Sequence, residues 1–368
     1  MQQSLISTKN ISGLAILLIV LFNQIRASAQ SDSLMENTFS SKIHPCPVIT
    51  FSPETSLGFG ITAFKLFHSG TENRTSNITG TAIYTIKNQV LLESATTVFF
   101  DREKWLTKGK VNFKQFPEYF YGVGEITSHD RLAKVDYTYY NIQGMLYRNI
   151  VKGLFVGAQS TYNRYFNVST SNDAALSANN IVGRDGARNL GIGLGLLYDT
   201  RNNVLNASSG VYIELSEMYF SKALGSDFQY NAFQIDMRRF ISVSPKSVLA
   251  FQFVGMVKTG EVPFLQLSYL GGSDIMRGFY AGRYRDKDFI AAQAEYRRQI
   301  TEHWGMVAFV GLGNVTDKLE NYDFTQLKRS VGIGARMTLD KKERVNLRLD
   351  MGMGNGQLNF YANIAEAF

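Results

Sequence analysis

The sequence predicts an all-β fold, a transmembrane antiparallel β-barrel with one loop folded into its lumen. Nineteen Tyr, 26 Phe and 32 Gly stand beside only six Pro, a composition rich in residues that form strands and turns. Several segments alternate apolar and polar side chains, as a strand does when its two faces meet different media. A Gly-rich segment, 271–288, comes directly before one such strand and predicts the inward loop.

The alternation runs through four segments of the chain: 211–220, 233–238, 290–297 and 358–368. Their polar faces carry charged side chains, among them Asp236, Arg238, Glu295 and Arg297, which suit a wet lumen. A soluble β-sandwich remains the alternative, because periodicity alone does not distinguish a lipid-facing surface from one packed on a second sheet. The segments are about ten residues long, whereas soluble strands have about 5–6, and this length favours the membrane barrel.

The last of these segments, 358–368, predicts the closing strand of the barrel. Phe360, Ile364 and Phe368 fall on one face and form the expected C-terminal strand signal, with Glu366 as the interruption. The first strand is expected near 52–67, where Gly58 and Gly60 weaken it. These two strands would form the seam at which the barrel closes.

Polar or Gly-rich stretches predict the connections between strands. They are 69–76, 101–104, 128–134, 169–189, 199–210, 221–227, 244–247, 271–288, 317–326 and 340–344. Short and long connections are interspersed along the chain, as expected of periplasmic turns and external loops.

The N-terminal residues predict export. Lys9 precedes a nine-residue apolar run, 14–22, and Ala27-Ser28-Ala29 has the small-residue pattern of a signal-peptidase site. We expect a signal peptide at 1–29, a short periplasmic segment at 30–47 and the barrel at 48–368. Removing 1–29 lowers the net charge from +7 to +5. The single Cys46 has no disulfide partner and is interpreted as an unpaired structural thiol.

Several motifs point to one family. Leu270-Gly271-Gly272, Arg277-Gly278-Phe279 and Glu295-Tyr296-Arg297 form a loop and strand in a fixed order. Weaker matches are Pro53-Glu54-Thr55 with Gly58 and Gly60, the segment 116–122, and 198–203 with the closing Gly210. With these motifs the chain resembles the barrel domain of the BamA/TamA superfamily, the bacterial surface antigen family, in a short form that lacks the periplasmic soluble repeat domains.

The resemblance implies a closed outer-membrane barrel of about sixteen strands whose loop enters the lumen. It implies that Arg277 contacts acidic or aromatic groups on the inner wall, and the candidate partners are Glu295 and Asp350. Gly278 would allow a backbone conformation closed to other residues, and Phe279 would pack where the loop meets the wall. The alternative is an exposed Arg-Gly turn at a loop tip.

The chain departs from the family pattern in two places. Gly311, in the strand segment 309–313, stands where the family has a lumen-facing Asp, so one partner of Arg277 is missing. The soluble repeat domain that receives unfolded clients in the family is also missing. The resemblance therefore implies assisted insertion or translocation of proteins, with unfolded outer-membrane proteins as clients, outer-membrane lipid as surroundings and a separate periplasmic partner. A passive channel or a structural barrel with a loop plug is the alternative.

Catalytic chemistry is not predicted. The four His, at 44, 68, 129 and 303, each stand alone, and none lies in a Gly-x-Ser-x-Gly or His-Glu-x-x-His motif. A barrel lipid hydrolase would need a His within reach of a Ser and an acid, a spatial arrangement that sequence spacing leaves open. We expect no enzyme activity, no cofactor, no metal site and no nucleic-acid partner.

Overall fold

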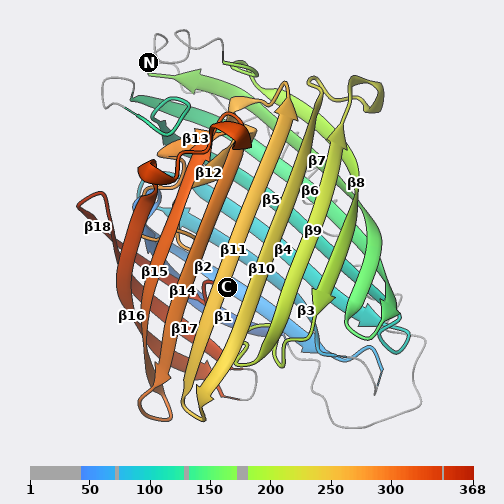
Figure 1. Cartoon of the computed structure of the whole chain (residues 1–368), viewed down its shortest axis with the longest axis vertical. Coiled ribbons are helices and arrows are strands. Elements are labelled where there is room, and N and C mark those ends of the chain that lie inside the picture. Colours follow the sequence, from blue (N-terminus) through green and yellow to red (C-terminus); the bar gives the residue numbers. More distant parts are fainter. Residues whose placement is uncertain (1–42, 71–73, 128–131, 172–180, 342–343) are drawn as a thin grey trace. The chain divides into compact units, whose positions relative to one another are not determined.

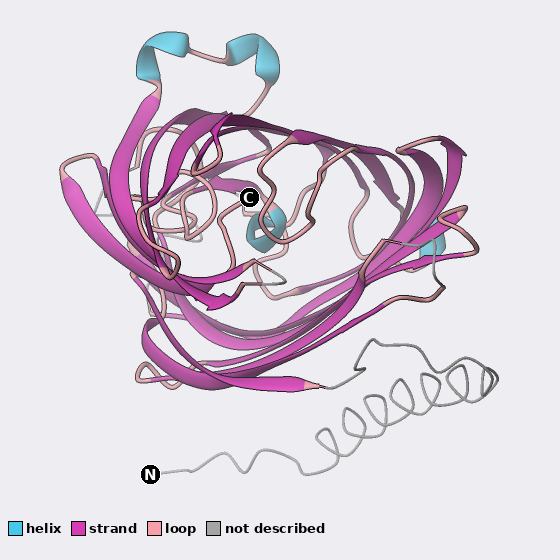
Figure 2. Ribbon diagram, turned by 90° about the horizontal axis from the view of Figure 1, so that it is seen from below, coloured by secondary structure: helices cyan, strands magenta, loops and turns pink. Residues whose placement is uncertain are grey.

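Alternating side chains build a closed ring of sixteen antiparallel strands in the computed structural model (Figures 1 and 2). The structure describes residues 43–70, 74–127, 132–171, 181–341 and 344–368. The predicted signal peptide, 1–29, and all but 43–47 of the predicted periplasmic segment lie outside these residues. Among the described residues, no helix is both long enough and apolar enough to cross a membrane.

The wall consists of strands that pair in chain order. They are β1 (His44–Ser52), β2 (Ser56–Phe67), β3 (Ser76–Thr85), β4 (Val90–Phe100), β5 (Trp105–Phe120), β6 (Ala133–Val151), β7 (Leu154–Thr170), β8 (Ala187–Asp199), β9 (Gly210–Phe220), β10 (Tyr230–Ser244), β11 (Ser247–Gly260), β14 (Asp288–Gln299), β15 (Trp304–Thr316), β16 (Lys328–Asp340), β17 (Val345–Gly354) and β18 (Gln357–Ile364). β1 pairs with both β2 and β18 and so closes the ring.

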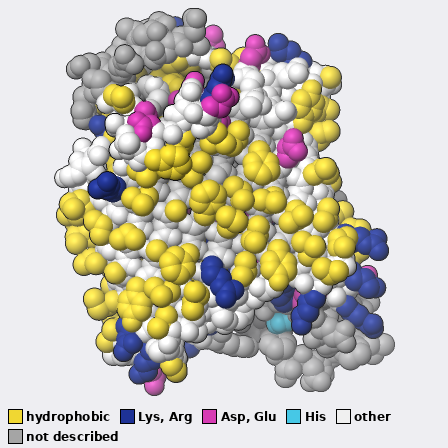
Figure 3. Space-filling model, viewed as in Figure 1, with side chains coloured by type: hydrophobic (Ala, Val, Ile, Leu, Met, Phe, Trp, Pro, Cys, Tyr) yellow, Lys and Arg dark blue, Asp and Glu magenta, His cyan; other side chains and the backbone are white. Residues whose placement is uncertain are grey.

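The predicted alternation separates an inner from an outer face. On β14, Gln293, Glu295 and Arg297 are buried in the lumen, while Tyr296 is exposed on the outside. The outer wall carries many exposed apolar side chains, such as Leu194 at 69%. Figure 3 shows these side chains covering the middle of one face, with most charged groups toward its two ends. This is the surface expected of a wall in contact with lipid.

The connections differ between the two ends of the barrel. One end, here the loop end, carries the long connections 121–132, 171–186, 221–229, 261–287 and 317–327, together with three short ones, 53–55, 86–89 and 355–356. The opposite end, the turn end, carries 68–75, 101–104, 152–153, 200–209, 245–246, 300–303 and 341–344. Each of the ten predicted connections overlaps a gap between strands, and several extend one to three residues into a neighbouring strand. The short connections at 53–55, 86–89, 152–153, 300–303 and 355–356 were not predicted, because too few residues mark them.

The two strands at the seam differ from the prediction. The first strand is His44–Ser52, and the segment with Gly58 and Gly60 is the second strand, paired with β1 on one side and β3 on the other. The last strand ends at Ile364 rather than at Phe368, because Ala365 has a left-handed backbone with φ of 73°. The residues after Ile364 turn into the lumen, and Figure 2 shows the C-terminus inside the ring.

Candidate functional site

The connection 261–287, here called the lumenal loop, folds back inside the barrel. It contains the short helix η3 (Phe264–Gln266) and a hairpin of β12 (Ser268–Leu270) with β13 (Tyr284–Asp286). Apolar side chains attach the loop to the inner wall in one buried cluster. The cluster joins loop residues to β11, β14 and β15 and consists of Val254, Leu270, Met276, Phe279, Tyr284, Phe289, Ala291 and Val315.

Arg277 is the centre of the attachment. Its side chain is completely buried, and its guanidinium contacts two carboxylates: Nη1 lies 2.5 Å from Asp350 Oδ2, and Nη2 binds Glu295 Oε1. The Phe309 ring packs under the guanidinium, with its centroid 3.6 Å from Cζ. A buried guanidinium needs charged partners and a flat apolar face, and β14, β15 and β17 supply them.

Glycines on the inner wall make room for the loop. A Cβ at Gly352 would lie 2.8 Å from the Arg277 carbonyl carbon, and one at Gly354 would lie 2.5 Å from the Phe279 ring. A Cβ at Gly311, where the family pattern predicts Asp, would lie 2.9 Å from the sulfur of Met276. Gly311 therefore removes one carboxylate and admits an apolar side chain in its place.

The loop is also bonded to both sides of the seam. On β18, the Tyr361 hydroxyl accepts from the Gly278 amide at 2.9 Å and donates to the Phe279 carbonyl at 3.3 Å. On the other side, the Glu54 carboxylate in the β1–β2 turn accepts from the Ala281 amide. The strands themselves share a single register pair, Phe51 with Ala362. The loop thus connects two edges that the sheet hardly joins.

Two chains of polar contacts run from Arg277 to the C-terminal residues. In the first, Asp350 pairs with Arg336 at 2.6 Å, and Arg336 pairs with Glu366 at 2.7 Å. In the second, Glu295 pairs with Arg297 at 2.8 Å, and Arg297 donates to the Phe368 carbonyl at 2.9 Å. Guanidinium and carboxylate groups thus alternate from the loop toward the turn end of the lumen.

Glu366, the last residue in the first series of contacts, has a lowered pKa. Burial of the Glu366 carboxyl disfavours its charged form, but the positive charges of Arg297 and Arg336 outweigh burial and lower its pKa. Glu366 is therefore a carboxylate in the folded protein at neutral pH, and it keeps its ion pair with Arg336.

The structure brings Arg277, Glu295 and Asp350 together, and Gly278 adopts the left-handed backbone with φ of 112°. Phe360 is 49% exposed on the outer face, and Ile364 ends β18. The prediction that Phe368 shares this outer face is wrong. Its ring is buried in the lumen against Phe240, because the chain leaves the strand at Ala365.

Sequence reasoning missed several contacts of the loop. Phe309, Tyr361 and Glu54 were not identified as its partners, although Tyr361 falls on the polar face of the alternation. The alternating glycines of β16 and β17 were an available signal, since a stripe without side chains on an inner face indicates close approach of another segment.

The described residues contain no group of three or more His, Cys, Asp or Glu that could hold a metal ion. His68 and His303 lie in turn-end connections outside the lumenal loop, and His129 lies outside the described residues. The groups assembled around Arg277 are guanidinium, carboxylate and aromatic side chains. Such a set binds and positions a segment of chain.

Comparison with known proteins agrees with this architecture. The chain is similar to the crystal structure of BamA from Haemophilus ducreyi lacking POTRA domains 1–3, with a TM-score of 0.58, 14% identity, and coverage of 89% of this chain and 70% of that one. It is also similar to CdiB from Acinetobacter baumannii, with a TM-score of 0.59, 9% identity, and coverage of 90% and 60%. For CdiB from Escherichia coli the values are 0.55, 8%, 90% and 64%.

The chain thus spans less than two thirds of either CdiB protein. No curated protein matches it in sequence. The Omp85 superfamily domain, however, matches residues 74–368, which is most of the chain. This chain therefore belongs to the Omp85 superfamily and is an outer-membrane β-barrel of that type.

Proposed function

We propose that this barrel assists the insertion or translocation of proteins at the bacterial outer membrane, with the seam between β1 and β18 as its working element. The observation that carries the proposal is the single register pair at the seam, Phe51 with Ala362. The neighbouring pairing of β1 with β2 extends over the whole of β1, from His44 to Ser52. Membership of the Omp85 superfamily supports the same function.

The physical basis is β-strand addition. A strand edge with unpaired N–H and C=O groups is a template for another strand, because main-chain hydrogen bonds supply affinity without a specific side-chain sequence. In the described part of the chain, the facing edges of β1 and β18 form no other register pair. A client strand would pair there first and would be released into the surrounding lipid.

The orientation follows from the connections. In outer-membrane barrels the short turns face the periplasm and the long loops face outward. The loop end carries 261–287 and the other long connections, so we place the turn end toward the periplasm. A client would then arrive at the turn end, delivered by a separate periplasmic protein.

A cross-link at the seam tests the proposal. Phe51→Cys and Ala362→Cys would form a disulfide between directly paired residues, whose Cα separation in an antiparallel pair suits the bond. Cys46→Ser removes the native thiol. The control is Val331→Cys with Met353→Cys, a directly paired, outward-facing couple in the continuous β16–β17 ladder.

Each variant is reconstituted in liposomes, and folding of a small test barrel is followed with the disulfide oxidised or reduced. We expect the oxidised seam to slow client folding to the rate in empty liposomes, reduction to restore it, and the control to behave as wild type in both states. Equal client folding with the seam oxidised and reduced would contradict a working seam.

A passive channel is the second candidate, because cavities remain at the turn end of the lumen. Side chains of the lumenal loop pack against the inner wall in two buried clusters, and this argues against free conduction. Ion conductance of the same liposomes separates the two functions. Steady conductance without any acceleration of client folding would replace the insertion proposal. Neither candidate requires covalent chemistry.

A further inference from the structure

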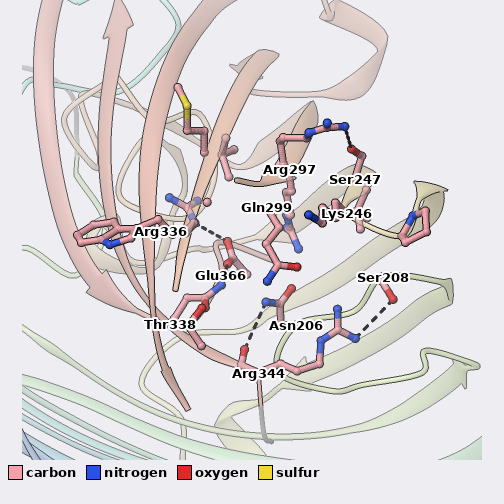
Figure 4. A pocket seen from close by; sticks show the side chains of 18 of the residues that line it. Asn206, Ser208, Lys246, Ser247, Arg297, Gln299, Arg336, Thr338, Arg344 and Glu366 are labelled. Atoms are coloured by element: carbon pink, nitrogen blue, oxygen red, sulfur yellow. Dashed lines mark hydrogen bonds and ion pairs between the residues drawn. The ribbon is translucent and has the colours of Figure 1, made fainter. Parts of the chain in front are cut away.

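A cavity of about 470 Å³ opens at the turn end of the lumen. Its walls come from the β8–β9 and β10–β11 connections, from Lys341 and Arg344 and from β14 and β16, and Figure 4 shows Lys246, Arg297, Arg336 and Arg344 around the same opening. No residue of the lumenal loop lines it. The cavity is therefore distinct from the site where Arg277 attaches the loop. The two are connected only through side chains of the wall, Arg297 and Arg336.

Its lining is strongly basic. Six Lys and Arg residues line the cavity against two acids, Glu302 and Glu366. Both acids already have partners: Glu302 pairs with Lys341 at 2.8 Å, and Glu366 binds Arg336 and the Asn346 amide. Arg297 and Arg336 also pair with Glu295 and Asp350 in the wall, so the uncompensated positive charge among the described residues belongs to Lys246, Arg298 and Arg344.

Several donors in the lining lack an acceptor. The Nη1 atom of Arg297 and the Nη2 atom of Arg336 are buried without a hydrogen-bond partner, although the two residues are only 7% and 3% exposed. Among the described residues, Lys246 pairs with no carboxylate, and Arg344 reaches only the Ser208 hydroxyl at 3.4 Å. The two buried Arg atoms do not reach the cavity surface, so Lys246 and Arg344 are the lining cations that an anion in the cavity would pair with.

The lowered pKa of Arg344 also favours an anion in the cavity. Burial lowers its pKa, and the nearby positive charge of Arg297 lowers it further. A carboxylate in the cavity would offset both effects.

The wall of the cavity already holds a peptide segment. The chain leaves β18 at Ala365, after which the Glu366 carboxylate pairs with Arg336 and the Phe368 carbonyl accepts from Arg297. The Phe368 ring packs on Phe240, with centroids 6.3 Å apart. The contacts combine a carboxylate, a main-chain carbonyl and an aromatic ring, which is the chemistry of an acidic peptide.

We propose that the cavity is a binding site for an acidic segment of another polypeptide. The segment lies beside residues 366–368 and places its carboxylates on Lys246 and Arg344. Binding there does not require the seam to open, so the site exists whether the barrel inserts proteins or conducts ions.

Fluorescence anisotropy with the full chain in detergent micelles tests the site. The probe is a fluorescein-labelled peptide of alternating Glu and Ala that ends in Phe, and its counterpart has Gln for every Glu. The variant Lys246→Gln with Arg344→Gln removes two cavity charges that take part in no internal ion pair among the described residues. The control, Lys222→Gln with Lys318→Gln, removes two charges at the loop end.

We expect the cavity variant to bind the acidic peptide about tenfold more weakly than wild type, the control to bind within about twofold, and the Gln peptide to show no saturable binding. Gel mobility of unheated samples verifies that both variants are folded. Equal affinity of the cavity variant and the control would overturn the proposal. The proposal would also be overturned if inorganic phosphate displaced the peptide at a phosphate concentration equal to the peptide's Kd. The cavity would then be a site for small anions.

Discussion

The seam and the wall formed by β14–β17 are held together in different ways. Along the wall, β15 pairs with β14 and β16 over nearly its full length. At the seam, β1 and β18 share one register pair, and the lumenal loop bonds to Tyr361 on one side and Glu54 on the other. Closure of the ring therefore depends on the loop where the sheet contributes least.

The loop can hold the seam only because the wall anchors it. Arg277 is buried with Glu295 and Asp350, and such an arrangement is weakly stabilising overall but costly to break, because a buried charge is left without its partner. The strength of the seam thus depends on charges buried on β14 and β17, in the part of the wall that continues from β18. Three variants test this dependence and a fourth tests the tail after β18, from the largest expected effect to the smallest.

Arg277→Met should produce the largest difference between the stability of the seam and that of the β14–β17 wall. It removes the cation that Glu295 and Asp350 share, and because Arg297 and Arg336 still pair with these carboxylates, the cost is about 3 kcal/mol, the lower end for a broken buried ion pair. We expect the loop to leave the lumen and the β18 amides to lose protection in hydrogen exchange, while the amides of β15 keep theirs. Arg188→Met is the control, because its ion pair with Asp227 is exposed and worth less than about 1 kcal/mol. Unchanged exchange of β18 in Arg277→Met would show that the seam stands without the loop.

Gly278→Ala tests the fit of the loop against β17. A Cβ there would lie 2.6 Å from the Met353 carbonyl carbon, in a backbone conformation with φ of 112°. Overpacking of this kind costs about 1–3 kcal/mol, so trypsin should cleave the loop after Arg277 or Arg283 faster than in wild type. Gly144→Ala, where a Cβ meets nothing within 4 Å, should cleave as wild type. Equal cleavage rates of the two variants would contradict a tightly seated loop.

Tyr361→Phe removes one bond between the loop and β18 and keeps the ring. The lost hydroxyl leaves the Gly278 amide without its acceptor, at a cost of about 1 kcal/mol. We expect faster hydrogen exchange at β18 and faster disulfide formation between Phe51→Cys and Ala362→Cys under mild oxidation. Tyr84→Phe loses an exposed hydroxyl bond to Asn88 and should leave both rates unchanged. Identical rates in Tyr361→Phe and wild type would assign the seam's closure to other contacts.

The smallest effect concerns the tail after β18. The folded-state pKa of Glu366 lies below its ordinary value of 4.5, so its stabilisation is complete above that pH and is lost as pH falls through the folded-state pKa. A fluorophore on Ala367→Cys, in the Cys46→Ser background, should become mobile at acid pH. Glu366→Gln should abolish this pH dependence. A pH response that persists in Glu366→Gln would assign it to another group.

Much of the fold was predictable from local pattern. Alternation along β10, β14 and β18 placed Asp236, Glu295 and Arg297 inside the barrel, as the structure confirms. The signal is local because each strand meets lipid on one face and the lumen on the other. Arg277 was identified as the loop's charged residue, with Glu295 and Asp350 as alternatives for its partner; the structure brings both to it at once.

Long-range placement was not predictable. The alternation of side chains is the same in every strand and does not show which strand closes the ring. The seam was therefore assigned to the segment with Gly58 and Gly60, whereas the first strand is His44–Ser52. It also carried Phe368 onto the outer face, because nothing in the local pattern marks the left-handed backbone at Ala365.

The sequence by itself determined the class of the barrel, the two faces of its strands and the charge chemistry of its loop, since these depend on neighbouring residues. Only the tertiary structure decided that Glu54, Tyr361 and Arg277 act on one loop and that the tail lies beside a basic cavity. These contacts join residues separated by up to 227 positions in the chain. They exist because the ring closes and its lumen is narrow enough for opposite walls to share one buried segment.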